Sequence, residues 1–103
     1  MHIFIETERG ERVEGLNDSE AIIERLLTRS EVWKNETLRC LRFIDLYGDT
    51  VFNNLQLPVF LKEWANLSQY AKTEEERGYI ENVTSMARRW CQKGHYYLKF
   101  YGD

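Results

Sequence analysis

The sequence predicts an α+β domain over residues 1–103, in which a small sheet of about four strands, antiparallel or mixed, packs against three helices. Short segments rich in β-branched and aromatic residues lie near the start, in the middle and at the end of the chain. Three further segments have apolar residues that recur at helical spacing. The expected order of elements is therefore β-α-β-β-α-α-β.

The first third of the chain predicts one strand followed by one helix. Residues 2–6 read "HIFIE" and have the composition of a strand, and the "ERGER" around Gly10 indicates a turn or loop. A helix is expected over about 18–29, because Asn17 and Glu20 have the spacing of a capping box and four aliphatic residues then share one helical face. A polar link follows this helix.

The middle of the chain predicts a β-hairpin. Residues 38–45 ("LRCLRFID") alternate in the manner of a strand with one buried face, and residues 51–54 ("VFNN") continue as a second short strand. The "YGDT" between them places Gly48 and Asp49 at the centre of a turn, where glycine tolerates a positive φ.

Two helices and a final strand complete the predicted fold. Pro58 suits the first position of one helix, and Thr73 and Glu76 have capping-box spacing at the start of the next, which ends near Gly94. The short link between these helices indicates an αα-hairpin. Residues 95–103 form an aromatic-rich strand, whose "LKFYGD" is similar to the earlier "LRFIDLYGD". The similarity favours one sheet for both segments.

Composition and charge limit the classes of function. The chain is 43% hydrophobic and 30% charged, as globular proteins are. No apolar run approaches the ~18 residues of a membrane span, and the N-terminus lacks a signal-peptide pattern, so a cytoplasmic protein without a membrane partner is expected. The net charge is −3, and residues 1–36 hold nine acidic and five basic side chains. This excess argues against a nucleic-acid partner and suits a basic protein partner.

Metal binding and catalysis have little support in the sequence. Asp45, Asp49 and Asn53 recur every four residues but lack the ligand spacing of an EF-hand. Cys40 and Cys91 are isolated and are expected to be buried free thiols, so no metal or cofactor is expected. Asp45 and Asp49 are the candidates for a carboxylate-dependent hydrolase. No histidine is well placed for nucleophilic catalysis and no phosphate-binding loop exists, so we expect that the chain is not an enzyme.

A protein-binding patch has more support. Aromatic side chains beside carboxylates are typical of protein–protein interfaces. Trp33 lies outside any predicted element, Tyr47 lies beside the predicted turn, and Tyr101 lies in the last strand. These three are the candidate anchors of a chain that we expect to be a monomer when free. The acidic candidates for partner binding are Glu6, Glu8, Glu11, Glu14, Asp45, Asp49 and Asp103.

Three segments carry a resemblance to a known group of proteins. These are "CLRFIDLYGDTVFNNLQLP" (residues 40–58), the "TEEER" that opens the second long helix (73–77), and the terminal "YLKFYGD" (97–103). Together they resemble a widespread group of small bacterial proteins, and the pattern spans about two thirds of the chain, from Leu38 onward. In size and acidity the chain is similar to the immunity proteins of contact-dependent inhibition and related polymorphic toxin systems.

This resemblance implies a cytoplasmic inhibitor of a toxin. Such a protein binds the toxic C-terminal domain of a large effector, often a nuclease, and covers its active site. The candidate acids and aromatics above would then contact the basic surface around that site. Residues 1–37 match no named pattern. The alternatives are a general interaction or regulatory module without a toxin partner and, third, a small hydrolase that uses Asp45 and Asp49.

Overall fold

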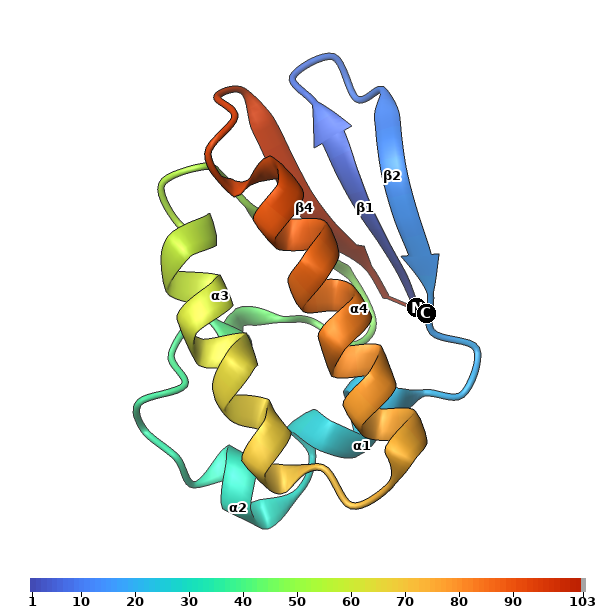
Figure 1. Ribbon diagram of the computed structural model, residues 1–103, viewed down its shortest axis with the longest axis vertical. Coiled ribbons are helices and arrows are strands. Elements are labelled where there is room, and N and C mark those ends of the chain that lie inside the picture. The colour runs from blue at the N-terminus through green and yellow to red at the C-terminus, as the bar shows by residue number, and fades with distance from the viewer. Residues whose placement is uncertain (103) are drawn as a thin grey trace.

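The computed structural model describes residues 1–102 (Figure 1). It contains one four-stranded antiparallel sheet in the order β2-β1-β4-β3. The strands are β1 (His2–Thr7), β2 (Arg12–Asn17), β3 (Asp49–Phe52) and β4 (Tyr96–Tyr101). The helices are α1 (Ile22–Leu27), α2 (Ser30–Trp33), α3 (Leu57–Asn66) and α4 (Glu74–Cys91), and two 3₁₀ turns are η1 (Leu41–Phe43) and η2 (Leu67–Tyr70).

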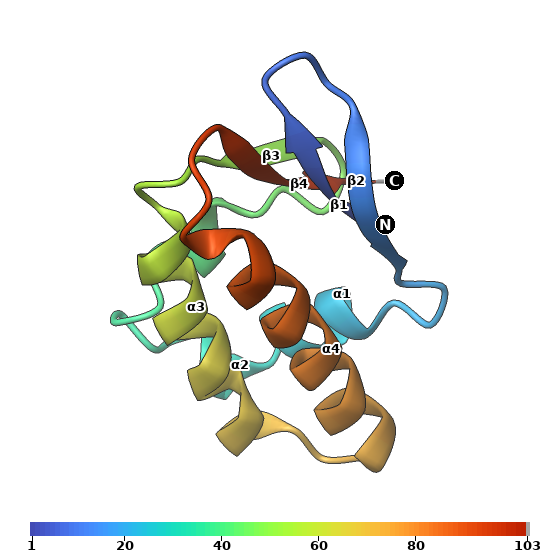
Figure 2. The ribbon, with the colours of Figure 1, turned by 45° about the horizontal axis from the view of Figure 1, so that its top comes forward.

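The α+β class and the four strands are confirmed, and the sheet is antiparallel. Within residues 1–102 there are four α-helices rather than three, and the order is β-β-α-α-β-α-α-β. The helices lie on one face of the sheet, with α3 and α4 side by side (Figure 2). The predicted order was wrong in the first half of the chain: α2 replaces part of the predicted polar link, and two further errors concern strands.

The first error concerns β2, which occupies residues for which the sequence predicted no strand. Glu14 pairs in register with the buried Ile5 and faces the helices. Its carboxylate accepts hydrogen bonds from Arg89 Nε at 3.0 Å and Trp90 Nε1 at 2.9 Å, both on α4. A bulge beside Ile5 also shifts the register of the two strands. An inward charge is typical of edge strands, and it removes the apolar alternation that identifies a strand.

The second error concerns residues 38–45, which were predicted to be a strand of a hairpin. They form turns and η1, and β3 pairs with β4 instead. The buried residues Leu38, Leu41 and Ile44 recur every three positions. That period belongs to a 3₁₀ turn rather than to a strand, whose period is two. The prediction of a hairpin turn centred on Gly48 and Asp49 is therefore also wrong, because Asp49 is the first residue of β3.

The predicted helix over 18–29 is shorter and has a different cap. Asp18 is buried, and its two carboxylate oxygens accept the backbone N–H groups of Ile22 and Ile23, both at 2.8 Å. Asn17, the predicted cap, is instead the last residue of β2. Asp18 thus satisfies two of the free N–H groups at the start of α1, which spans only the six residues Ile22–Leu27.

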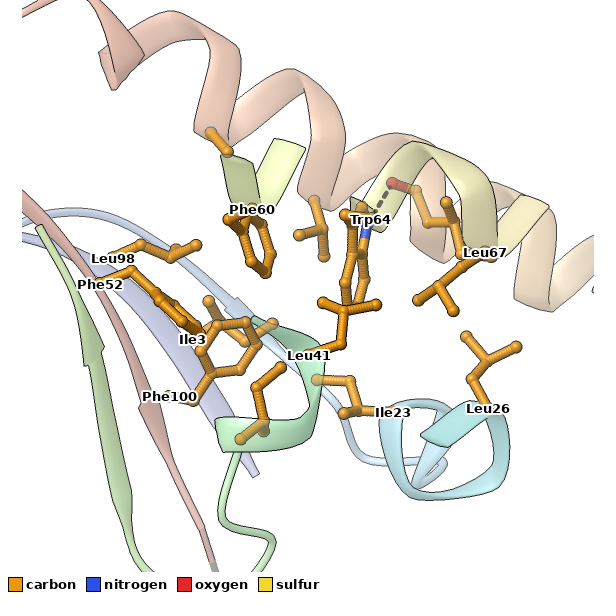
Figure 3. Packing of buried hydrophobic residues seen from close by; sticks show 14 of the residues in the cluster. Ile3, Ile23, Leu26, Leu41, Phe52, Phe60, Trp64, Leu67, Leu98 and Phe100 are labelled. Carbon is orange, nitrogen blue, oxygen red and sulfur yellow. Dashed lines mark hydrogen bonds between the residues drawn. The ribbon is translucent and has the colours of Figure 1, made fainter. Parts of the chain in front are cut away.

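The αα-hairpin of α3 and α4 is confirmed, and it builds the core against the sheet. Phe52 and Phe100 from the sheet meet Phe60 and Trp64 from α3 (Figure 3). The ring centroids are 5.2 Å apart for Phe52–Phe60 and 5.4 Å for Phe60–Trp64. The indole N–H of Trp64 donates to the backbone carbonyl of Ile80 on α4 at 3.0 Å. This bond satisfies the polar atom of a fully buried side chain and joins the two helices.

A buried ion pair joins the short helices to the long ones. Arg29 lies between α1 and α2, and its guanidinium donates to both carboxylate oxygens of Glu76 on α4, at 2.7 and 2.6 Å. It also donates to the carbonyl of Tyr70 at 2.8 Å. Glu76, only 1% exposed, accepts the backbone N–H of Lys72 at 2.8 Å as well. The predicted cap of α4 is present too, since Thr73 Oγ1 accepts the Glu76 N–H.

We predict that Glu76→Gln destabilises the fold by about 3 kcal/mol at neutral pH, because it leaves the half-buried guanidinium of Arg29 without its charge partner. The Arg29 hydrogen bond lowers the pKa of Glu76 from 4.5 to about 2. A lowered pKa stabilises the fold above pH 4.5, and this contribution is lost as the pH falls toward 2.

Urea unfolding at a series of pH values measures this effect. The difference between wild type and Glu76→Gln should shrink between about pH 4.5 and 2. Glu74→Gln is the matched control, because Glu74 also pairs with an arginine but is exposed, and it should change stability by less than about 0.5 kcal/mol. Equal effects of the two variants would contradict a structural role for the buried pair.

Candidate functional site

Three large aromatic side chains are exposed in the segment from α2 to the start of β3. Trp33 is 65% exposed, Phe43 is 73% exposed and Tyr47 is 77% exposed. Exposed aromatics of this size are enriched among the residues that dominate binding energy in protein interfaces. Trp33 and Tyr47 were predicted to be anchors. Phe43 was missed, because a strand over 38–45 gave no reason to expect it on the surface.

An apolar pocket of about 90 Å³ lies beside Trp33. We call it the α2–η1 pocket, after the two elements that contribute most to it. Its lining is apolar except for Thr28 and Arg42; the other members are Leu27, Val32, Trp33, Leu38, Leu41, Ile44 and Leu46. Sites for small molecules and cofactors usually enclose about 300–1,000 Å³. The α2–η1 pocket is therefore the size for one side chain rather than for a metabolite.

Arg42 fixes one wall of the α2–η1 pocket. One of its guanidinium nitrogens donates to the backbone carbonyl of Trp33 at 2.7 Å, and the guanidinium carbon lies 5.9 Å from the centre of the Trp33 ring. These contacts join η1 to α2 across nine residues of sequence. Arg42 thus holds this wall through the Trp33 backbone and an exposed cation–π contact. The Trp33 ring remains exposed to solvent.

Glu63 supports the floor of the α2–η1 pocket from behind. It lies on α3, is buried, and accepts the backbone N–H of Leu41 at 3.2 Å. Burial, with the negative charge of Glu63, raises the pKa of the half-buried Cys40 thiol. Cys40 and Cys91 are both free and half-buried, less buried than the sequence predicted. The buried carboxylate of Glu63 therefore holds η1 in place, and no feature of the sequence predicts this contact.

The turn that contains Asp45, Tyr47 and Asp49 is held by its own polar groups. Asp45 Oδ1 accepts the Tyr47 N–H at 2.9 Å, and the Asp45 N–H donates to Thr50 Oγ1 at 2.8 Å. Asp49 pairs in register with Tyr101 of β4. The carboxylate of Asp45 therefore has a structural task. Its partner in the proposed hydrolase, Asp49, lies at the exposed start of β3.

The repeated "YGD" noticed in the sequence has a structural explanation. Gly102 follows β4 and donates its N–H to the carbonyl of Gly48, before β3, at 2.7 Å. A Cβ at Gly102 would lie 2.6 Å from the backbone nitrogen and oxygen of Gly48, closer than real Cβ atoms come. The two backbones approach this closely because Gly102 has no side chain, whereas a Cβ at Gly48 would instead lie 2.6 Å from the Asp45 carboxylate. Asp103 lies outside the described residues.

Glu6 and Glu14, two of the acidic candidates in the first third, have partners within the chain. Glu6 lies on the sheet face away from the helices, is buried, and bonds to Tyr101 OH and to Lys99 Nζ at 3.1 Å. Burial by itself raises the pKa of Glu6, but the Tyr101 and Lys99 contacts outweigh it and the pKa is lowered. For Glu14, the hydrogen bond from Arg89 has the larger influence and lowers the pKa despite burial.

The remaining acids lie at the far end of the β1–β2 hairpin. Glu8 is paired with Nδ1 of His95, and Glu11 is exposed near it, and both line a second, open pocket. Thus Asp45, Tyr47 and Asp49 lie in one turn, with Asp49 paired to Tyr101 of β4. Trp33 lines the α2–η1 pocket, whereas the exposed Phe43 of η1 does not. The structure does not gather the four glutamates of the β1–β2 hairpin, two in the strands and two in the turn, into one acidic surface.

Comparison with known proteins found no matching family model, no similar curated protein and no similar solved structure. Within residues 1–102, no helix combines the length and apolarity needed to cross a bilayer. The same residues contain no group of three or more histidine, cysteine or acidic side chains arranged to hold a metal ion.

We predict that Gly102→Ala destabilises the fold by about 1–3 kcal/mol, since the new methyl group must push β4 away from Gly48. The matched control is Gly78→Ala. Gly78 lies in α4 with open space around it, so alanine there should stabilise the fold by roughly 0.5–1 kcal/mol. Thermal unfolding of both variants measures the difference. A neutral Gly102→Ala would contradict the close backbone approach.

Proposed function

We propose that this chain is an immunity protein, which binds the toxic C-terminal domain of a bacterial effector in the cytoplasm and covers its active site. The observation that carries the proposal is the α2–η1 pocket with exposed Trp33 at its edge and exposed Phe43 and Tyr47 in the same segment. The similarity of the chain to immunity proteins in size and acidity is its second support.

The physical basis is that of an anchored interface. A few aromatic and apolar side chains, packed into a side-chain-sized pocket, supply most of the free energy of binding in protein complexes. Trp33 and the pocket are fixed before binding by Arg42 and Glu63, so little conformational entropy is lost when a partner docks. An inhibitor needs this property, since it must hold its target for long periods.

The size of a stable interface extends the site beyond the pocket. A standard interface covers ~800 Å² of each partner, whereas the whole described chain exposes 6195 Å². The three aromatics can therefore form only the centre of the contact. Asp45 and Asp49 lie on either side of Tyr47 in sequence and are exposed, so they suit the rim that meets basic residues of a partner.

The general interaction module remains the second candidate, because the same pocket would serve any protein partner. Gene order separates the two, since an immunity gene lies directly after the gene of its effector. No observation favours the hydrolase, since Asp45 uses its carboxylate to hold the turn.

We predict that the tagged chain captures the inactivated C-terminal domain of the effector encoded by the preceding gene. Trp33→Ala and Phe43→Ala should each weaken this binding by ~30-fold, the loss expected for a hot-spot residue. Val59→Ala is the control, because Val59 is exposed on α3, outside the segment from α2 to the start of β3 that carries the three exposed aromatics. Calorimetric titration of each variant measures the affinity.

Two results would contradict the proposal. One is no binding between wild-type chain and effector domain when both are folded. The other is binding that Trp33→Ala and Val59→Ala affect equally, which would move the interface elsewhere. Capture of a different protein through Trp33 would instead support the general interaction module.

A further inference from the structure

We infer that the α2–η1 pocket receives an apolar side chain that is followed by a carboxylate in the partner protein. This inference rests on the proposed function and specifies the chemistry of the partner at the point of contact. The carboxylate is a local contact at the pocket. It is separate from the long-range preference for a basic partner, which follows from the negative net charge of the whole chain.

The apolar part of the inference follows from the lining of the pocket. Leu27, Val32, Leu41 and Ile44 are buried residues of the core cluster that also line the pocket. Filling the pocket removes their remaining apolar surface from water, at about 25 cal/mol for each Å². The volume of about 90 Å³ suits one branched aliphatic or small aromatic side chain.

The acidic part follows from Arg42, the one charged residue among those that line the pocket within residues 1–102. Its single described hydrogen bond leaves several N–H donors of the guanidinium free. No carboxylate of residues 1–102 forms an ion pair with it, in contrast to Arg12, Arg29 and Arg89, each of which is paired with a glutamate.

The exposed charges near Arg42 in sequence favour this polarity, while the buried carboxylate of Glu63 behind the floor is bonded to the Leu41 N–H. Arg39 lies three residues before Arg42, is exposed, and likewise has no carboxylate partner among residues 1–102. Asp45, the acid that follows Arg42 most closely in sequence, directs an oxygen to the Tyr47 N–H. A carboxylate of the partner could therefore accept a charge-assisted hydrogen bond from Arg42, whereas an ammonium group there would be repelled.

Two short peptides test the inference. The probes are acetyl-Leu-Asp-Asp-amide and acetyl-Leu-Lys-Lys-amide, titrated at low salt into the full ¹⁵N-labelled chain and observed by NMR. The acidic peptide should shift the resonances of Val32, Leu41 and the Trp33 indole N–H, and it should bind about fivefold more tightly than the basic peptide.

Variants separate the charge from the fold. Arg42→Gln should abolish the preference for the acidic peptide, and Arg42→Lys should retain most of it. Arg88→Gln is the matched control, since Arg88 is exposed on α4 and away from the pocket, and it should leave the preference unchanged.

Equal binding of the two peptides, or shifts confined to another surface, would overturn the inference. Concentration-dependent shifts of the same resonances without peptide would also overturn it, by showing that a second copy of the chain occupies the pocket. A different result would contradict the proposed function. That result is unchanged capture of the effector domain by Trp33→Ala, and it is independent of how the two peptides bind.

Discussion

The Arg29–Glu76 ion pair is the contact on which the arrangement of the helices depends. The pair is bidentate, with a buried carboxylate and a half-buried guanidinium, and it ties the junction of α1 and α2 to the start of α4. Arg29 also holds the carbonyl of Tyr70, at the end of η2. Without this clamp the two short helices would have little to fix them, because isolated helices of four to six residues are unstable in water.

The α2–η1 pocket is a consequence of this clamp. Leu27 and Val32 lie close to Arg29 in sequence, on the two helices that the pair holds in place. The opposite wall, η1, is held by Glu63 from α3. Two buried glutamates from the long helices thus position the two sides of a pocket that neither side could form alone. This division explains how short, irregular elements provide a rigid surface for binding.

Local chemistry made part of the fold predictable from the sequence, and tertiary contacts hid the rest. Pro58 and Thr73 indicate the starts of α3 and α4, and the β-branched residues at the start of the chain indicate β1. The strand β2 was missed because Glu14 faces inward to Arg89, a partner 75 residues away. Of the candidate site, Trp33 and Tyr47 could be chosen by residue type. Phe43 could have been predicted as an exposed residue only from the three-residue period of Leu38, Leu41 and Ile44.

The most direct test of this account is the footprint of the partner on the chain. Hydrogen–deuterium exchange would be measured on the chain alone and mixed with the inactivated effector domain. The account predicts that backbone amides of α2, η1 and the turn before β3 become protected on binding, with little change on the exposed face of α4. Protection confined to α4, or to β1 and β4 alone, would place the interface elsewhere and contradict the central claim.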